Sequence, residues 1–117
     1  MSLRALAQSQ ISAVDVVIAS GQQTSGAATL ASGSTLIAIS MPAAFTGAAL
    51  TFTGCDTAAG TYKALYDSSG NAISVTCAAS RYIMLDAATF AGVPYLKVVS
   101  GSAEGAERTI RLIVRNV

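Results

Sequence analysis

The sequence predicts an all-β protein, a single antiparallel β-sandwich or jelly-roll-like domain of about eight to nine short strands. Apolar and polar residues alternate over short runs, and Gly, Ser and Pro separate these runs at intervals of about ten residues. Ser, Thr, Gly, Ala and Val are common, whereas Glu and Lys, which favour helices, are scarce. The 117 residues are enough for one domain with its own core.

The clearest β pattern runs from residue 50 to residue 76. Leu50 and Phe52 alternate with threonines, so one face of that strand is expected to be apolar. Alternation continues over residues 62–66 and 73–77. Between them, residues 67–71 (DSSGN) contain Gly and Asn, which adopt positive φ at low cost. We therefore expect a β-hairpin with a short loop at this point.

The flanking chain predicts further strands and two local features. Phe45 is expected to be a buried plug in the loop of residues 43–48. Asp86 is expected to be the N-cap of one helical turn over residues 86–90. The other strands are expected at residues 15–19, 27–30, 35–40, 82–85, 95–100 and 109–114.

Residues 1–13 are expected to lie outside the sandwich, which would span residues 14–117. Leu3 and Leu6 have the spacing of a short helical turn, but an extended arm fits equally well. Such a segment either frays, as termini often do, or docks on a neighbouring subunit with Leu3, Leu6 and Ile11 as anchors. We therefore expect these three residues to be interface candidates.

Charge is unusually sparse. Charged residues make up 11% of the chain, the net charge is +1, and none lies between Asp15 and Asp56. Hydroxyl and amide groups could solvate that surface, or other subunits could cover it, because interface cores are depleted of charge. The balance gives no footprint for nucleic acid. Residues 36–52 are uncharged but too short and too interrupted to span a membrane, and we expect no signal peptide.

The residue types give little support for an enzyme. Histidine is absent, which removes the usual general base and the commonest zinc ligand. Asp56 and Asp67 could approach each other as a glycosidase pair or calcium site, but carboxylates that accept backbone hydrogen bonds in turns are the simpler interpretation. We expect no catalytic residue, no metal and no cofactor. Cys55 and Cys77 are expected to be reduced, partly buried thiols; the alternative is a disulfide between them, which would add about 3 kcal/mol by closing a loop.

Two further groups are candidates for binding. Tyr62 and Tyr66 are expected on one strand face, where they could stack on a sugar ring or be ordinary half-buried strand residues. Arg111 and Arg115 share one face of the last strand. They could bind an acidic partner, or they could be solvated charges at a sheet edge that discourage unwanted strand pairing.

Several segments carry a resemblance to a known class of proteins. The runs SGQQTSGA, LIAISMPAAFTGAALTF, TYKALYDSSGNAISV, RYIMLD, FAGVPYLKVVSG and ERTIRLIVRN, over about residues 15–116, resemble small proteins encoded in tailed-bacteriophage structural gene modules.

The resemblance implies a β-sandwich or jelly-roll virion component without enzymatic activity. It would be a capsid decoration or cement protein, assembled in the host cytoplasm, whose partners are other copies of itself, for example in a trimer, and the major capsid protein or other virion proteins. Neither nucleic acid nor membrane is expected as a partner. The resemblance carries over no functional residue. The alternative is a glycan-binding module of a tail fibre or baseplate, using Tyr62 and Tyr66.

Overall fold

The computed structural model describes residues 11–30 and 34–116 of the chain. Over these ranges it is almost entirely β, as the sequence predicted. The elements are β1 (Ile11–Ile18), β2 (Ala28–Thr29), β3 (Ser34–Ser40), β4 (Ala49–Cys55), β5 (Lys63–Ala64), β6 (Ser74–Thr76), β7 (Tyr82–Met84), the 3-10 helix η1 (Ala87–Phe90), β8 (Tyr95–Ser100) and β9 (Arg108–Asn116).

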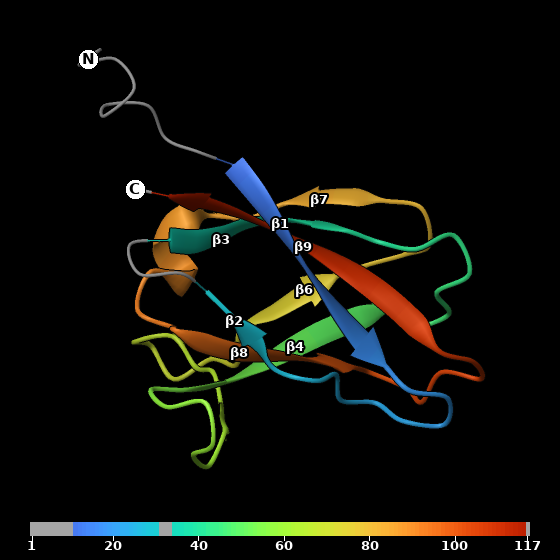
Figure 1. Ribbon diagram of the computed structural model, residues 1–117, viewed down its shortest axis with the longest axis horizontal. Helices are drawn as coiled ribbons and strands as arrows, with labels where there is room; N and C mark the ends of the chain where they lie inside the picture. The colour runs from blue at the N-terminus through green and yellow to red at the C-terminus, as the bar shows by residue number, and fades with distance from the viewer. Residues whose placement is uncertain (1–10, 31–33, 117) are drawn as a thin grey trace.

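The strands form two antiparallel sheets that stack face to face (Figure 1). Sheet A has the order β1-β9-β3-β7. Sheet B has the order β2-β8-β4-β5, and β6 also pairs with β4. The first strand therefore lies beside the last one, and most neighbours in the sheets are distant in sequence. This arrangement is the antiparallel β-sandwich expected from the alternating pattern.

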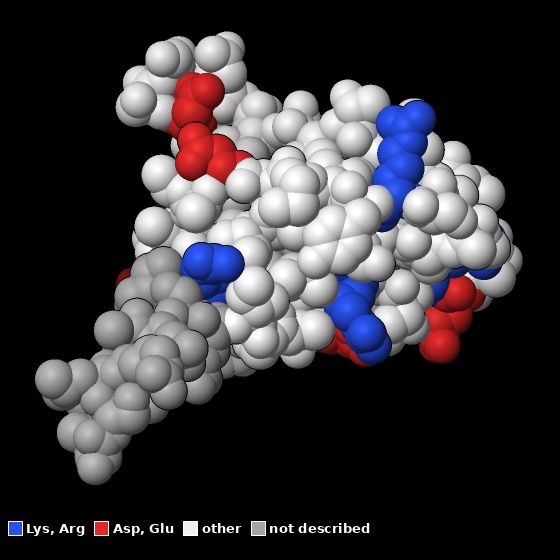
Figure 2. Space-filling view, turned by 90° about the horizontal axis from the view of Figure 1, so that it is seen from above, with Lys and Arg blue, Asp and Glu red and all other residues white. Residues whose placement is uncertain are grey.

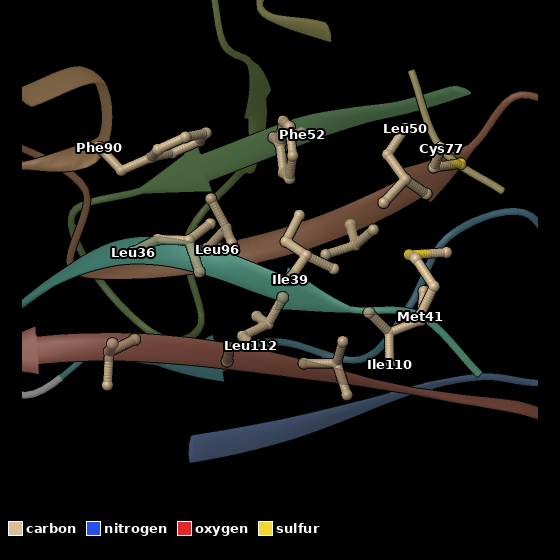
Figure 3. Close-up of a cluster of buried hydrophobic side chains, with 14 of the residues drawn as sticks. Leu36, Ile39, Met41, Leu50, Phe52, Cys77, Phe90, Leu96, Ile110 and Leu112 are labelled. Carbon is tan, nitrogen blue, oxygen red and sulfur yellow. The ribbon is translucent and has the colours of Figure 1, made fainter. Parts of the chain in front are cut away.

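The core is the layer between the two sheets, filled by the inward side chains of the longer strands and of η1 (Figure 3). In β4 the side chains of Leu50 and Phe52 are buried, whereas Thr51 between them is exposed. Phe52 meets Phe90 of η1 edge to face, with ring centroids 5.0 Å apart. Phe45 is buried, which confirms its expected role as a plug. From sheet A, the inner face contributes Val16, Ile18, Leu36, Ile39, Ile110, Leu112 and Val114.

Two local predictions are confirmed at atomic detail. The Asp86 side chain accepts a hydrogen bond from the Ala88 backbone N–H and so caps η1. In the hairpin loop, the Asp67 carboxylate accepts from the backbone N–H groups of Ser69 and Asn71, and Gly70 has φ of 85°. The flanking strands β5 and β6 are shorter than expected, and Tyr66 forms only an isolated bridge with Ala72.

The first strand begins earlier than the sequence indicated. β1 starts at Ile11, so residues 11–13, expected in an N-terminal arm, belong to sheet A. Ile11, Ser12 and Ala13 pair in register with the last residues of β9, and this long-range ladder has no local sequence signal. The proposed anchors Leu3 and Leu6 lie outside the described residues.

Truncation of Phe52 to Ala should lower the free energy of unfolding by about 3–5 kcal/mol, because it removes a fully buried ring and leaves a cavity beside Phe90. Urea denaturation followed by circular dichroism measures the change. The control is Thr51→Ala on the exposed face of the same strand, which should cost no more than about 1 kcal/mol. Equal losses in the two variants would contradict the assignment of the two faces.

Candidate interaction surface

The outward face of sheet A carries an apolar row that crosses all four strands. Strand register places Ala13 of β1 beside Ile113 of β9, Ile113 beside Ala38 of β3, and Ala38 beside Met84 of β7. Ala38 and Ile113, in the middle of the row, are largely buried by their surroundings, whereas Met84 is 69% exposed. A sheet face that contacts only water normally carries polar residues at such positions.

Exposed large apolar side chains are concentrated on this same face. In the described part of the chain they are Ile11, Val17, Tyr66, Tyr82 and Met84. All except Tyr66 occupy outward positions of β1 and β7, as their register with β9 and β3 shows. We call the outward face of β1, β9, β3 and β7 the sheet A surface. Figure 2, which views the molecule from the β7 side of Figure 1, shows a face made mostly of uncharged residues, with charged groups at a few places.

One ion pair lies in the sheet A surface. Arg111 of β9 donates from Nε to Oδ1 of Asp15 on β1, at 3.1 Å, and both side chains are exposed. The hydrogen bond and the negative charge of Asp15 raise the pKa of Arg111. The charges of Arg111 and Asp15 cancel each other, so this position has little net attraction for an acidic partner.

The expectation that Arg111 and Arg115 guard a sheet edge is wrong. Their strand, β9, lies between β1 and β3 and has no free edge. Register with β1 places Arg111 beside Asp15 and Arg115 beside Ile11, so both belong to the sheet A surface. The structure therefore brings the candidate interface residues Ile11, Arg111 and Arg115 together on one face, although they are far apart in the sequence.

The tyrosines proposed as a glycan platform lie on the side of sheet B. Tyr62 is half-buried, donates its hydroxyl hydrogen to the Ala58 carbonyl at 3.0 Å, and has Lys97 Nζ 4.4 Å from its ring centroid. Tyr66 is 62% exposed. One face of the Tyr62 ring is thus already occupied by a cation, which leaves less of it for stacking on a sugar.

Glu104 is a buried carboxylate that the sequence reasoning missed. It lies in a Gly- and Ser-containing loop where a charged side chain is normally solvated, but only 1% of it is exposed. Oε1 accepts from the Thr46 N–H at 3.0 Å and from Arg108 Nε at 2.9 Å. Oε2 accepts from the Thr46 hydroxyl at 2.9 Å and from the Gly47 N–H at 3.1 Å. Both oxygens are occupied, so the group joins loops and is not available to a substrate.

Glu104 also ties in a third loop through its backbone. Its carbonyl accepts from Gly21 N–H and its own N–H donates to the Gln22 carbonyl. Burial by itself raises the pKa of its carboxyl, but the hydrogen bonds from Arg108 and Thr46 and the charge of Arg108 outweigh burial, so its pKa is lowered. The ionised form is therefore the one that stabilises the fold.

The remaining candidate groups do not assemble into a site. Among residues 11–30 and 34–116, no three His, Cys, Asp or Glu side chains gather as a metal-binding group. Cys55 and Cys77 are both free thiols near opposite ends of β4, about 20 Å apart along the strand. Cys77 is buried and donates to the Gly47 carbonyl, and this burial raises the pKa of its thiol.

An open groove of about 560 Å³ runs between β6 and β7, where the two sheets are not joined. Half-buried Ile73, Val75, Ile83 and Leu85 line it, together with Asp67 and Asp86 near the hairpin and η1. Both carboxylates already accept backbone hydrogen bonds, so the groove offers an apolar wall and no reactive group of its own. Within the described residues, no helix is long and apolar enough to cross a membrane.

No family model, no curated protein and no solved structure matches this chain.

Replacement of Glu104 by Gln should lower the free energy of unfolding at pH 7 by about 3 kcal/mol, because a buried ion pair loses one partner. Because the pKa of Glu104 is lower in the folded than in the unfolded protein, its ionised carboxylate stabilises the fold at pH values above the unfolded pKa, which is about 4.3. This stabilisation is lost as the pH falls through the lower pKa of the folded protein. Urea denaturation between pH 7 and pH 3 should therefore show a steeper loss on acidification for the wild type than for Glu104→Gln.

The exposed Glu107→Gln replacement, nearby in the same sequence region, is the control and should leave the pH dependence unchanged. Parallel pH profiles for wild type and Glu104→Gln would show that the Glu104 carboxylate does not stabilise the fold in its ionised form.

Proposed function

We propose that this protein is a non-enzymatic structural component of a tailed-bacteriophage virion, a decoration or cement protein that binds the major capsid shell as an oligomer. The observation that carries the proposal is the concentration of exposed apolar side chains on the sheet A surface. Burial of such side chains against a partner is favourable by about 25 cal/mol per Å² of apolar area. A face with this composition is typical of a surface made for a protein neighbour.

Four of the six carboxylates have structural roles. Asp67 and Asp86 cap a turn and a helix, and Glu104 joins loops. Asp15 pairs with Arg111. Each of these carboxylates has a partner within the chain, which supports a role in assembly over one in catalysis.

The resemblance of residues 15–116 to small proteins of phage structural modules directs the proposal to a virion. A sandwich suits such a role, because a largely apolar face on a sheet can dock with little loss of conformational freedom. The head shell is the proposed binding surface.

A glycan-binding module of a tail fibre or baseplate is the second candidate. Exposure of Tyr66 favours it, since an exposed aromatic ring on a sheet side can stack on a sugar. It is the weaker candidate because Lys97 lies over the ring of Tyr62.

Gold-labelled antibody against this protein, applied to intact phage particles from the host that produces it, tests the proposal by electron microscopy. Label distributed over the head is the expected result. Label confined to the tail would overturn the head assignment in favour of the second candidate, and particles without label would overturn the virion role.

Replacement of Met84 by Asp should reduce incorporation into particles at least tenfold, because it places a charge in the apolar row of the sheet A surface. Quantitative mass spectrometry of purified particles measures incorporation. The control is Ser74→Asp, at an exposed position of sheet B, which should be incorporated normally. Equal incorporation of both variants would exclude the sheet A surface as the contact.

A further inference from the structure

β1 forms one edge of sheet A, and its backbone groups can be assigned to the two sides of the strand. The Val17 carbonyl accepts a hydrogen bond from Gly26 N–H at 3.1 Å, outside the ladder with β9, so Val17 points its backbone groups away from β9. Orientation alternates along an antiparallel strand. Ile11, Ala13 and Asp15 therefore also direct their N–H and C=O groups toward the free edge.

The other side of the sheet gives the same assignment independently. The Met41 N–H donates to the Arg81 carbonyl and the Leu85 N–H donates to the Ile37 carbonyl, so the odd-numbered residues after the register shift at Leu36 face β7. Ala38 and Ser40 then face β9, and their register with Ile113 and Arg111 makes odd-numbered β9 residues face β3. The backbone N–H and C=O groups of even-numbered β9 residues therefore form the hydrogen bonds to β1, where they pair with even-numbered residues.

Among the described residues, the edge formed by Ile11, Ala13 and Asp15 has no pairing strand. Gly26 covers the edge at Val17, but the edge-facing groups of the other three residues have no backbone partner within the described chain. Proteins usually protect such an edge with Pro, Lys or a bulge. β1 contains none of these, and its one charge, Asp15, is neutralised by Arg111.

We propose that β1 pairs antiparallel with β1 of a second copy about a twofold axis at Ala13, which makes the two A sheets one continuous sheet. This inference deepens the proposed assembly function and rests on it. Ala13 would lie opposite Ala13 of the partner subunit, and Ile11 opposite Asp15 of the partner subunit. Edge-facing pairs of this kind exchange two hydrogen bonds each, so the contact would form about six.

The β1 edge is complementary to itself, which identifies its partner as a second copy of the chain. The pairing joins the two apolar rows at Ala13, so that a single row runs from Met84 across both molecules, and it covers Ile11, now 58% exposed. Arg115 has no carboxylate partner among the described residues. In the pairing its backbone would lie two strand spacings, about 10 Å, from the backbone of Asp15 of the partner subunit. The two side chains together can span that distance. An unrelated extended peptide would form hydrogen bonds with the backbone groups of β1, but it would not continue the apolar row or place a carboxylate near Arg115.

Two charged variants at one position test the pairing. In Ala13→Arg, two like charges would face each other across the axis, and the same holds for Ala13→Asp. Sedimentation equilibrium at about 100 μM should find a dimer for the wild type and a monomer for each variant. An equimolar mixture of the two variants should form a heterodimer again, because opposite charges then meet. Urea denaturation should confirm that both variants remain folded, since Ala13 is exposed.

The control is Thr109→Arg, an exposed position on β9 away from the edge, which should remain dimeric. A monomeric wild type, variants that stay dimeric, or variants that fail to combine when mixed would each overturn the pairing. This result is separable from the virion role. A dimer absent from particles refutes the virion role alone, whereas a monomer that labels phage heads refutes the pairing alone.

Discussion

The alternation of side chains along the strands, which sends one face of each sheet into a shared core, is the constraint on which the rest of this structure depends. Phe52 from β4, Leu112 from β9 and Phe90 from η1 meet in that layer (Figure 3). Because the inner face is apolar, strand register is fixed, since a shift by one residue would turn the buried set outward. The same register determines which residues form the outward face, so the core and the sheet A surface are two consequences of one pattern.

Local features of the fold could be predicted because their causes are local. The hairpin at Asp67, the N-cap at Asp86 and the buried plug Phe45 each follow from a few adjacent residues. Long-range features could not. The pairing of Ile11 with Arg115 has no local signal, and neither has the capture of Glu104 by the Thr46 loop, 58 residues away. Glu104 and Arg108 do have i, i+4 spacing, but in a loop this spacing does not indicate burial.

On the candidate surface too, residue types could be noted from the sequence, whereas their arrangement depends on long-range strand pairing. The sequence marks Ile11, Arg111 and Arg115 as interface candidates, but only the strand order β1-β9-β3-β7 shows that they share one face. Exposure of Met84 could not be predicted, because a short alternating strand does not reveal which face meets the core. The uncharged stretch between Asp15 and Asp56, in contrast, indicates directly that much of the chain contributes no electrostatic repulsion between neighbouring molecules. Within the described chain, the exposed apolar side chains of sheet A lie beside a strand edge that has no pairing strand, and both features support the proposed contact with another protein.

Amide hydrogen exchange along β1, measured by NMR at low and high protein concentration, tests most directly whether that edge is made for assembly. In dilute solution, the account predicts slow exchange for the even-numbered amides that bond β9 and fast exchange at Ala13 and Asp15. At high concentration these two amides should become protected as well, because a second β1 strand accepts their hydrogen bonds. Fast exchange at Ala13 and Asp15 at every concentration would contradict the account.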